Sequence, residues 1–195
     1  MSPDSDRTLV ERLIAGDSAA FDEVHAAHNV RLFTFLVRLS RSRDVAEDLL
    51  EETWVRLVSH ARRLRHDTNL SCWLFTVARN LYTSYCRSRL VEESHAPALM
   101  TLWPAGTPRP SPFEEAAASQ AERRIEAALT DLPLPYREAL LLVGVEGLQP
   151  SQAASICRIT PEAMRQRLSR ARALLSERLE SSPDPIRHVL REVLS

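Results

Sequence analysis

The chain has 195 residues, of which 44% are hydrophobic and 26% charged, and its formal net charge is −1. This composition is typical of a soluble globular protein and excludes a chain that is disordered overall, and the length allows one large domain or two small ones. Autonomous DNA-binding proteins usually carry a basic excess, so the near-neutral balance means that a DNA-binding surface here is either local or assisted by another protein.

The glycine, proline and cysteine content indicates the fold class and the state of the thiols. There are 4 glycines and 12 prolines, and β-branched runs are few, which predicts an all-α fold with connections marked by proline. Cys72, Cys86 and Cys157 lie far apart without a zinc-binding spacing, so we expect reduced thiols, no metal and no cofactor. The N-terminus has no signal-peptide pattern, and no apolar run approaches the length of about 20 residues that a membrane span needs. These features predict a cytoplasmic protein.

The first half of the chain predicts a helical bundle. An amphipathic helix is expected over residues 6–15, and Ser18 is expected to cap a second helix. After a polar break, Asp44 is expected to cap a third helix over 45–60, with acids opposite its apolar residues Val45, Leu49, Thr53, Trp54, Leu57 and Val58. His25 and His28 lie one turn apart, but a metal pair is disfavoured because no third ligand is near.

A further helix, predicted from about Ser71, changes character along its length. Its start is apolar, whereas its end carries arginines with Tyr82 and Tyr85 between them. Basic residues interleaved with aromatic ones are typical of a surface that grips a nucleic-acid backbone and stacks on exposed bases. Alternatively, the tyrosines belong to the core and the arginines are solvated. This segment alone does not decide between the two interpretations.

Helical spacing is lost over residues 92–114, where prolines recur, and this segment predicts a semi-rigid linker. We therefore expect a first domain over 1–91, a second over 115–181 and a tail over 182–195. The end of the tail, IRHVLREVLS, predicts a short amphipathic helix without an assigned function.

The second domain predicts a helix-turn-helix. Helical spacing resumes over 115–129, a stop and restart follow at 132–135, and an apolar helix is expected over 137–146. Residues 149–179 then read as a helix, a turn at Cys157–Ile159 and a longer helix. Thr160 is expected to cap that longer helix, with Pro161 at its first position, where the missing N–H costs nothing.

The longer helix has two distinct faces. Met164, Leu168, Ala171 and Leu175 form a predicted buried stripe. The outward residues are predicted to be Arg165, Gln166, Ser169, Arg170 and Arg172. A helix that packs along one stripe and presents arginines and an amide on the other side is what recognition in the major groove needs. The alternative is an ordinary helical hairpin with a solvated arginine face.

The order of these motifs resembles a known family. The first domain carries AFDEVHAAHNVRLFTFLVRL, DVAEDLLEETWVRL and CWLFTVARNLYTSY; the second carries LPLPYREALLLVGVEGLQPSQAAS and TPEAMRQRLSRARALL. In order and spacing, the chain resembles bacterial extracytoplasmic-function (group 4) sigma factors of the sigma-70 family, from about residue 20 to 179. The resemblance implies two helical domains, sigma region 2 and the region 4 helix-turn-helix, joined by the linker.

The resemblance also implies functional residues. In the family, the helix with the AED motif docks on the β′ clamp helices of core RNA polymerase, and the family also contacts the β flap. The implied polymerase-binding residues are Asp48, Leu49, Glu51, Glu52, Trp54 and Arg56. The loop 66–70 and the following helix would bind the melted minus-10 element, and the last helix would enter the minus-35 major groove. The implied DNA-binding residues are Arg79, Asn80, Arg87, Arg89, Thr160, Arg165, Gln166, Arg167 and Arg170.

The family pattern is not matched at every position. Glu51 stands where the family usually has glutamine, and Gln149 stands in place of the usual hydroxyl cap. Arg158 stands where the turn usually has glycine, so the resemblance implies a left-handed residue there.

The expected function is that of a promoter-specificity factor with an anti-sigma partner, no membrane partner and no catalytic residues. Two alternatives are a sigma-like decoy that binds an anti-sigma factor and a free-standing helix-turn-helix regulator. An enzyme is the least favoured class, because the chain has no phosphate loop, metal cluster or nucleophile–base motif.

Overall fold

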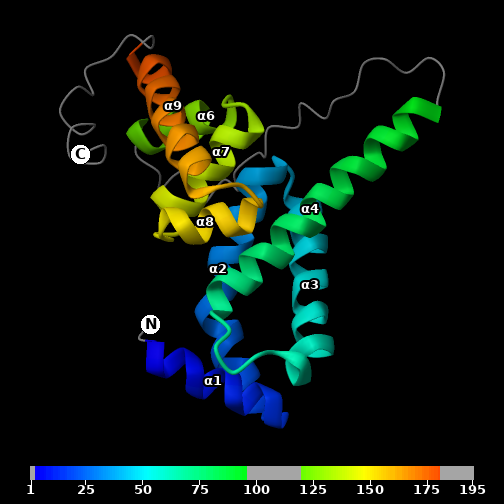
Figure 1. Ribbon diagram of the computed structural model, residues 1–195. Helices are drawn as coiled ribbons and strands as arrows, with labels where there is room; N and C mark the ends of the chain where they lie inside the picture. Colours follow the sequence, from blue (N-terminus) through cyan, green and yellow to red (C-terminus); the bar gives the residue numbers. More distant parts are fainter. Residues whose placement is uncertain (1–2, 96–119, 181–195) are drawn as a thin grey trace. The chain divides into compact units, whose positions relative to one another are not determined.

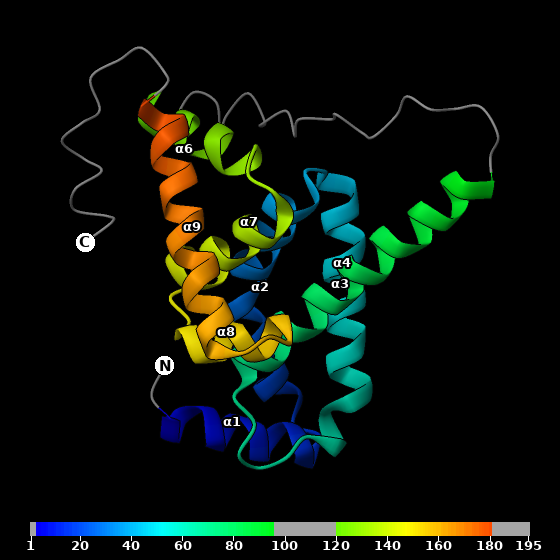
Figure 2. The ribbon, with the colours of Figure 1, turned by 45° about the horizontal axis from the view of Figure 1, so that its top comes forward.

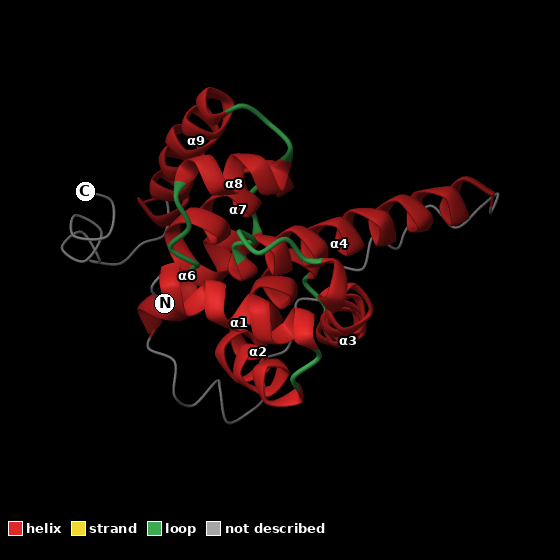
Figure 3. Ribbon diagram, turned by 60° about the horizontal axis from the view of Figure 1, so that its bottom comes forward, coloured by secondary structure: helices red, strands yellow, loops and turns green. Residues whose placement is uncertain are grey.

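The computed structural model describes residues 3–95 and 120–180, which form helices and the turns between them (Figures 1 and 3). The chain divides into two compact units, Met1–Pro108 and Arg109–Ser195. The all-α class with two helical domains is confirmed, whereas the exact domain boundaries stay a prediction. Most of the predicted linker and the tail lie outside the described residues. Within residues 3–95 and 120–180, no helix combines the length and apolarity of a membrane span.

Three long helices form the core of unit 1. They are α2 (Ser18–Ser40), α3 (Arg43–His60) and α4 (Leu70–His95), and they contact one another pairwise (Figure 1). Helix α1 (Pro3–Ala15) packs on α2 and on the 3-10 turn Ala61–Arg63 at one end of these helices (Figure 2). The rings of Phe35 and Phe75, both fully buried, meet edge to face with centroids 5.2 Å apart. Large apolar side chains therefore join α2 to α4 at the centre of the unit.

Two predicted caps lie one or two residues away from the observed ones. Asp17 caps α2, because its Oδ1 accepts from Ala19 N–H at 2.9 Å. The hydrogen bond from the Arg12 side chain to Asp17 (2.7 Å), together with the Ala19 N–H, lowers the pKa of this carboxyl. Ser42 rather than Asp44 caps α3, with Val45 N–H donating to its Oγ. A cap residue needs extended backbone, which Asp17 and Ser42 adopt and which the helical residues after them do not.

The buried stripe of α3 also differs from the predicted one. Trp54 is 9% exposed, and its Nε1–H donates to Asn29 Oδ1 of α2 at 3.0 Å. Val58 is 62% exposed, so its predicted place in the core is wrong. Successive helical residues are about 100° apart, and the stripe that includes Ala46 and Leu57 turns Val58 away from the core.

His25 and His28 each have a contact within unit 1. The His28 side chain is buried and its Nδ1 lies 3.0 Å from Val24 O. The His25 ring packs against Trp54, with centroids 4.8 Å apart. In the described part of the chain, no group of three or more metal-binding side chains comes together.

Unit 2 is built around its last helix. Helices α6 (Gln120–Thr130), α7 (Leu134–Leu140) and α8 (Pro150–Cys157) all pack against α9 (Pro161–Glu180). The buried Arg137 closes the turn between α6 and α7, where its Nη2 donates to Thr130 O at 2.7 Å and to Leu132 O at 2.9 Å.

The helix predicted over residues 137–146 is not a single α-helix. It begins earlier, at Leu134, because Pro135 is tolerated in a first turn. From Leu141 to Val145 it is π-helical, and Glu146 N–H donates to Leu141 O, five residues earlier, at 2.9 Å. Gly144 lies inside this wider turn, and glycine has little intrinsic preference for the α-helix.

The helix-turn-helix has the predicted turn. Arg158 is left-handed, with φ 57° and ψ 46°. Its N–H donates to Ser155 O at 3.1 Å, and Ile159 N–H donates to Ala154 O at 3.0 Å. These two bonds close the end of α8 in a Schellman motif. Thr160 caps α9 as expected, since its Oγ1 accepts from Ala163 N–H at 3.1 Å.

At the start of α8, the side chain of Gln152 accepts a hydrogen bond from the backbone of Gln149, which stands at the cap position. The N–H of Gln149 donates to the side-chain Oε1 of Gln152 at 2.9 Å. Pro150 follows at the first helical position.

The left-handed Arg158 gives a stability prediction. Glycine adopts this conformation without the clash of a Cβ atom, so Arg158→Gly should raise the free energy of unfolding of unit 2 by about 0.5–1 kcal/mol. All three tryptophans lie outside residues 120–180. The measurement is therefore native-state hydrogen exchange of the α8 and α9 amides. Arg158→Ala removes the same charge but keeps the Cβ atom, so it should give no gain; equal stabilisation by both variants would contradict the strain argument.

Candidate nucleic-acid interface

The buried stripe on one side of α9 determines which side of the helix exposes its arginines. Met164, Leu168, Ala171 and Leu175 are all buried, as predicted. We call the exposed side the recognition surface, defined by Arg165, Gln166, Ser169, Arg170 and Arg172. Arg167 is half-buried, so it has less freedom to contact a ligand than its neighbours. From residue 165 to 172 there are four arginines and no acid, so the local charge is positive.

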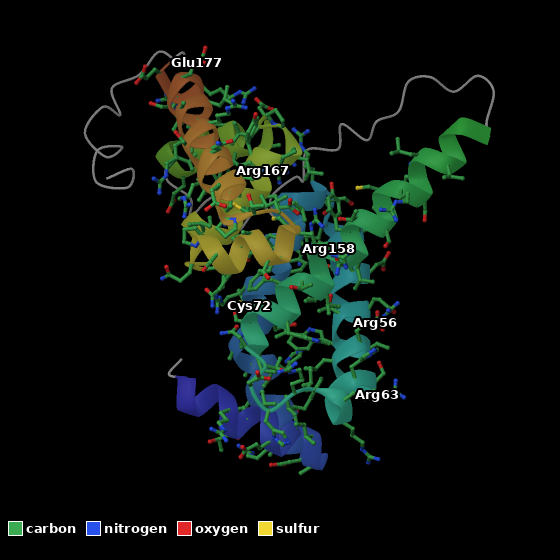
Figure 4. The ribbon with its side chains drawn as sticks, in the orientation of Figure 1. Arg56, Arg63, Cys72, Arg158, Arg167 and Glu177 are labelled. Carbon is green, nitrogen blue, oxygen red and sulfur yellow. The ribbon has the colours of Figure 1, made fainter. Side chains whose placement is uncertain are left out.

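Arg165 has one partner on its own helix. Its Nη2 lies 2.7 Å from Oε1 of Glu162, and both side chains are more than 60% exposed. Exposed pairs of this kind contribute about 0.5 kcal/mol, so a phosphate or a base edge can displace Glu162. Thr160 at the start of the helix is exposed, but its hydroxyl already accepts the capping hydrogen bond. Figure 4 shows Arg158 in the turn before α9 and Glu177 near the other end of the helix.

The residues predicted to bind the polymerase lie partly on the surface of α3 and partly in the core. Asp48, Glu51 and Arg56 are exposed, and Glu52 is half-buried with its Oε1 2.7 Å from Arg56 Nε. Leu49 and Trp54 are buried. These two side chains therefore support α3 from inside, and they do not lie on its outer surface.

Sequence reasoning missed two exposed apolar residues on α3. Val55 is 53% exposed and Val58 is 62% exposed. With Asp48 and Glu51 they follow a 3–4–3 spacing, which places all four on one side of the helix. We call this side the α3 outer stripe. Apolar side chains exposed among acids are typical of a surface that binds another protein.

Helix α4 changes from core to surface along its length. Tyr82 is buried, Arg79, Asn80 and Tyr85 are half-buried, and residues 87–91 are all exposed. Figure 2 shows this end of α4 extending beyond α2 and α3. Both interpretations of the basic-aromatic segment therefore hold in part, because Tyr82 belongs to the core and Arg87 and Arg89 lie on the surface.

The loop before α4 is held by its own side chains. Arg65 makes two hydrogen bonds to the carboxylate of Asp67, at 3.0 and 3.1 Å, and this pairing lowers the pKa of Asp67. Arg65 N–H also donates to Thr68 Oγ1, and Asn69 Oδ1 caps α4 by accepting from Cys72 N–H at 2.8 Å. His66 is exposed within this loop.

Exposed arginines also lie just before the loop. Arg62 and Arg63 belong to the 3-10 turn, where Figure 4 marks Arg63 at the end of α3. Sequence reasoning assigned no function to these two arginines, although a run of arginines beside a polar loop is a recognisable signal of a backbone-binding surface.

One of the three cysteines, Cys157, packs in the core. Cys157 is 5% exposed at the end of α8, and Cys72 and Cys86 are half-buried.

Comparison with protein families gives two matches. Residues 24–90 match the Sigma-70 region 2 model, and residues 122–175 match the Sigma-70, region 4 model.

Curated relatives match most of the chain. An ECF RNA polymerase sigma factor, EcfG, from Rhodopseudomonas palustris (strain TIE-1) is 36% identical over 160 residues, which is 82% of this chain and 84% of the relative. The ECF sigma factor SigM from Bacillus subtilis (strain 168) is 31% identical over 159 residues, covering 79% of this chain and 91% of the relative.

Solved structures share the fold. CnrH in complex with the cytosolic domain of CnrY superposes with a TM-score of 0.67 at 22% identity, covering 91% of this chain and 98% of that chain. The sigma factor RpoE from Bartonella quintana, in complex with the anti-sigma factor NepR, gives 0.66 at 27% identity, covering 82% and 96%.

Proposed function

The chain belongs to the extracytoplasmic-function sigma factors of the sigma-70 family, and from this premise we propose how its residues recognise a promoter. It is a promoter-specificity sigma factor, which binds core RNA polymerase and promoter DNA. In our proposal, residues 1–91 form the unit that binds the polymerase and the minus-10 element. Residues 115–181 form the unit that binds the minus-35 element.

The recognition surface of α9 supports this proposal most directly. Four arginines without an acid follow one another between residues 165 and 172, on a helix whose opposite side is buried. Guanidinium groups pair with guanine in the major groove, and Gln166 can pair with adenine. Arg165, Gln166 and Arg170 are the proposed base-reading residues. The half-buried Arg167 and the α9 N-terminus at Thr160 are proposed to position the DNA backbone.

The end of α4 and the preceding loop are proposed to bind the opened minus-10 element. Arg87 and Arg89 are exposed beyond the core, and Arg79 and Asn80 lie about two to three helical turns closer to it. Arginine and amide groups spaced along a helix can hold a strand along its backbone and receive bases that leave the stack. The side chains of Thr68 and Asn69 support this role because they hydrogen-bond to the backbone at the two ends of the loop.

The α3 outer stripe is proposed as the surface for the β′ clamp helices. Asp48 and Glu51 supply negative charge, and the exposed Val55 and Val58 beside them supply apolar area that a partner can bury. The buried Leu49 and Trp54 are proposed to act on this interface only by holding α3 in place. The β flap is a further proposed contact of the second unit.

Three finer points follow from the same premise. We propose that the chain performs no chemistry of its own, since phosphodiester bond formation belongs to the polymerase. We propose a cytoplasmic location, where that polymerase acts. We also propose an anti-sigma partner, because a solved structure with the same fold is a complex of a sigma factor with an anti-sigma factor.

In vitro transcription tests the proposal. Sigma-free core polymerase, the purified chain and a library of promoters should give transcripts that depend on the chain. If no promoter supports such transcription while the chain still binds an anti-sigma factor, the chain is a sigma-like decoy and the proposal fails.

Arg165→Ala should weaken selection of the minus-35 element by about 1–3 kcal/mol, the usual value of a bidentate base contact. The measurement is the promoter preference of the reconstituted holoenzyme across a library of minus-35 sequences. Arg123→Ala, which removes an exposed arginine from α6, is the matched control and should leave the preference unchanged. An unaltered preference with Arg165→Ala would remove this residue from the recognition surface.

Glu51→Arg should weaken binding to core polymerase at least about tenfold, because reversing the charge places like charges opposite each other at the proposed interface. The measurement is fluorescence anisotropy of the labelled chain titrated with core polymerase. Glu11→Arg makes the same change on α1 and should have little effect. Equal losses for both variants would show that net charge, and not the α3 outer stripe, governs the affinity.

A further inference from the structure

The outer side of α3 changes charge along the helix. Residues 44–52 contain five acids and no basic residue, whereas residues 53–65 contain four arginines and no acid. The α3 outer stripe follows the same order, because Asp48 and Glu51 lie near its start and the exposed Val55 and Val58 come after them. Arg62 follows Val58 by four residues, in the 3-10 turn that continues the helix, and it extends the stripe to a basic end.

The charges at both ends of the stripe are available to a partner. Four side chains there are exposed: Asp48, Glu51, Arg62 and Arg63. None of the four makes a side-chain hydrogen bond or ion pair with residues 3–95 or 120–180. Nη2 of Arg62 lies 3.9 Å from the position that a Cβ atom would take at Gly16, so this guanidinium rests beside the turn between α1 and α2 without being bonded to it.

Other charges of α3 are paired within the helix. Arg43 Nε lies 2.9 Å from Glu47 Oε1, and Arg56 Nε lies 2.7 Å from Glu52 Oε1. Figure 4 shows Arg56 on α3 and Arg63 at the end of the helix. The unpaired charge of the stripe is therefore negative at its start and positive at its end.

Such a stripe is complementary to a second copy of itself. Val55 lies seven residues from Asp48 and seven from Arg62, about 10 Å along the helix in each direction. When two copies of α3 run antiparallel with their Val55 side chains opposite each other, each Asp48 faces Arg62 of the other copy. A parallel pair would instead place like charges opposite each other. An interface with two-fold symmetry needs this self-complementarity.

The centre of the stripe supplies apolar area. Val55 is 53% exposed and Val58 is 62% exposed. In an antiparallel pair the valines of both copies meet near the two-fold axis, where packed helices approach to about 8–10 Å. Apolar contact at the centre and opposite charges at the rim are the usual arrangement of a protein interface. One helix pair is a small interface, so the association is transient and leaves the stripe accessible to other partners.

We propose that two copies of the chain associate antiparallel through the α3 outer stripe, with Asp48 of each copy paired to Arg62 of the other around Val55. The dimer covers the surface that the proposed function assigns to the β′ clamp helices, so each copy keeps the other from the polymerase. This second part rests on the proposed polymerase contact, whereas the association itself rests only on the geometry and charge of α3.

Charge reversal tests the pairing. Sedimentation equilibrium of the full chain at low salt should show a dimer that grows with concentration. Asp48→Arg and Arg62→Asp should each raise the dissociation constant at least about tenfold, because like charges then face each other at both ends of the interface. An equimolar mixture of the two variants should dimerise again, because each introduced charge then faces its opposite.

A matched control separates the pairing from net charge. Glu11→Arg on α1 changes the net charge as Asp48→Arg does, and it should leave the dissociation constant unchanged. An unaltered chain that stays monomeric at submillimolar concentration would overturn the proposal, as would a mixture of the two charge variants that stays monomeric.

Cross-linking tests the position of the two-fold axis. A short bismaleimide should join two copies of Val55→Cys, because this position meets itself in the dimer. Val30→Cys on α2 is the control: Val30 is 71% exposed, more than Val55, and should give no product beyond the background of the unaltered chain with its three cysteines. Equal products from both variants would overturn the proposal.

The purified cross-linked dimer then tests the masking of the polymerase surface. Its affinity for core polymerase, measured by fluorescence anisotropy, should be at least about tenfold lower than that of uncross-linked Val55→Cys. Undiminished binding would overturn the masking and would also contradict the proposed polymerase contact on α3. A chain that does not self-associate would overturn the dimer alone and leave the proposed function standing.

Discussion

The contact on which unit 2 depends is the buried stripe of α9. Met164 and Ala171 are fully buried, and Leu168 and Leu175 are nearly so, where α6, α7 and α8 meet the helix. Because this stripe fixes the rotation of α9 about its own axis, it also fixes which residues face outward. The arginines of the recognition surface are therefore oriented by apolar packing and not by contacts of their own. Turning the helix by one residue, about 100°, would remove both the packing and the recognition surface.

In unit 1, buried side chains likewise position the exposed residues of a longer helix, α4. The first half of α4 is packed through Phe75 and Tyr82, while residues 87–91 are exposed. The core thus holds one end of α4 in place while the other end lies on the surface. On the neighbouring α3, the hydrogen bond from Trp54 to Asn29 fixes the helix on α2 and turns the α3 outer stripe to the surface. In both units, the buried side chains of a helix determine which of its other side chains are exposed.

Features that depend on a single helix could be predicted from the sequence. The α9 stripe and the Thr160 cap are examples, because spacing and local backbone chemistry determine them, whereas the left-handed Arg158 was expected from the family resemblance. Features that depend on the position of a neighbouring helix could not be predicted from the sequence. Trp54 and Val58 are both apolar and lie four residues apart, and only the position of α2 decides that Trp54 is buried and Val58 exposed. The caps at Asp17 and Ser42 were missed because adjacent polar residues have similar propensities, and the backbone path selects one of them. The roles proposed for individual DNA- and polymerase-binding residues remain predictions.

The central claim is that the chain positions its contacts while the polymerase supplies most of the DNA affinity. A net charge of −1 leaves the isolated chain with only local positive surfaces, and phosphate neutralisation dominates protein–DNA affinity. The most direct measurement is the affinity for promoter and non-promoter DNA as salt increases, for the chain alone and for its complex with core polymerase. We predict weak, unselective binding by the chain alone and strong, promoter-selective binding by the complex. Equal affinity and selectivity of the isolated chain and the complex would contradict the account.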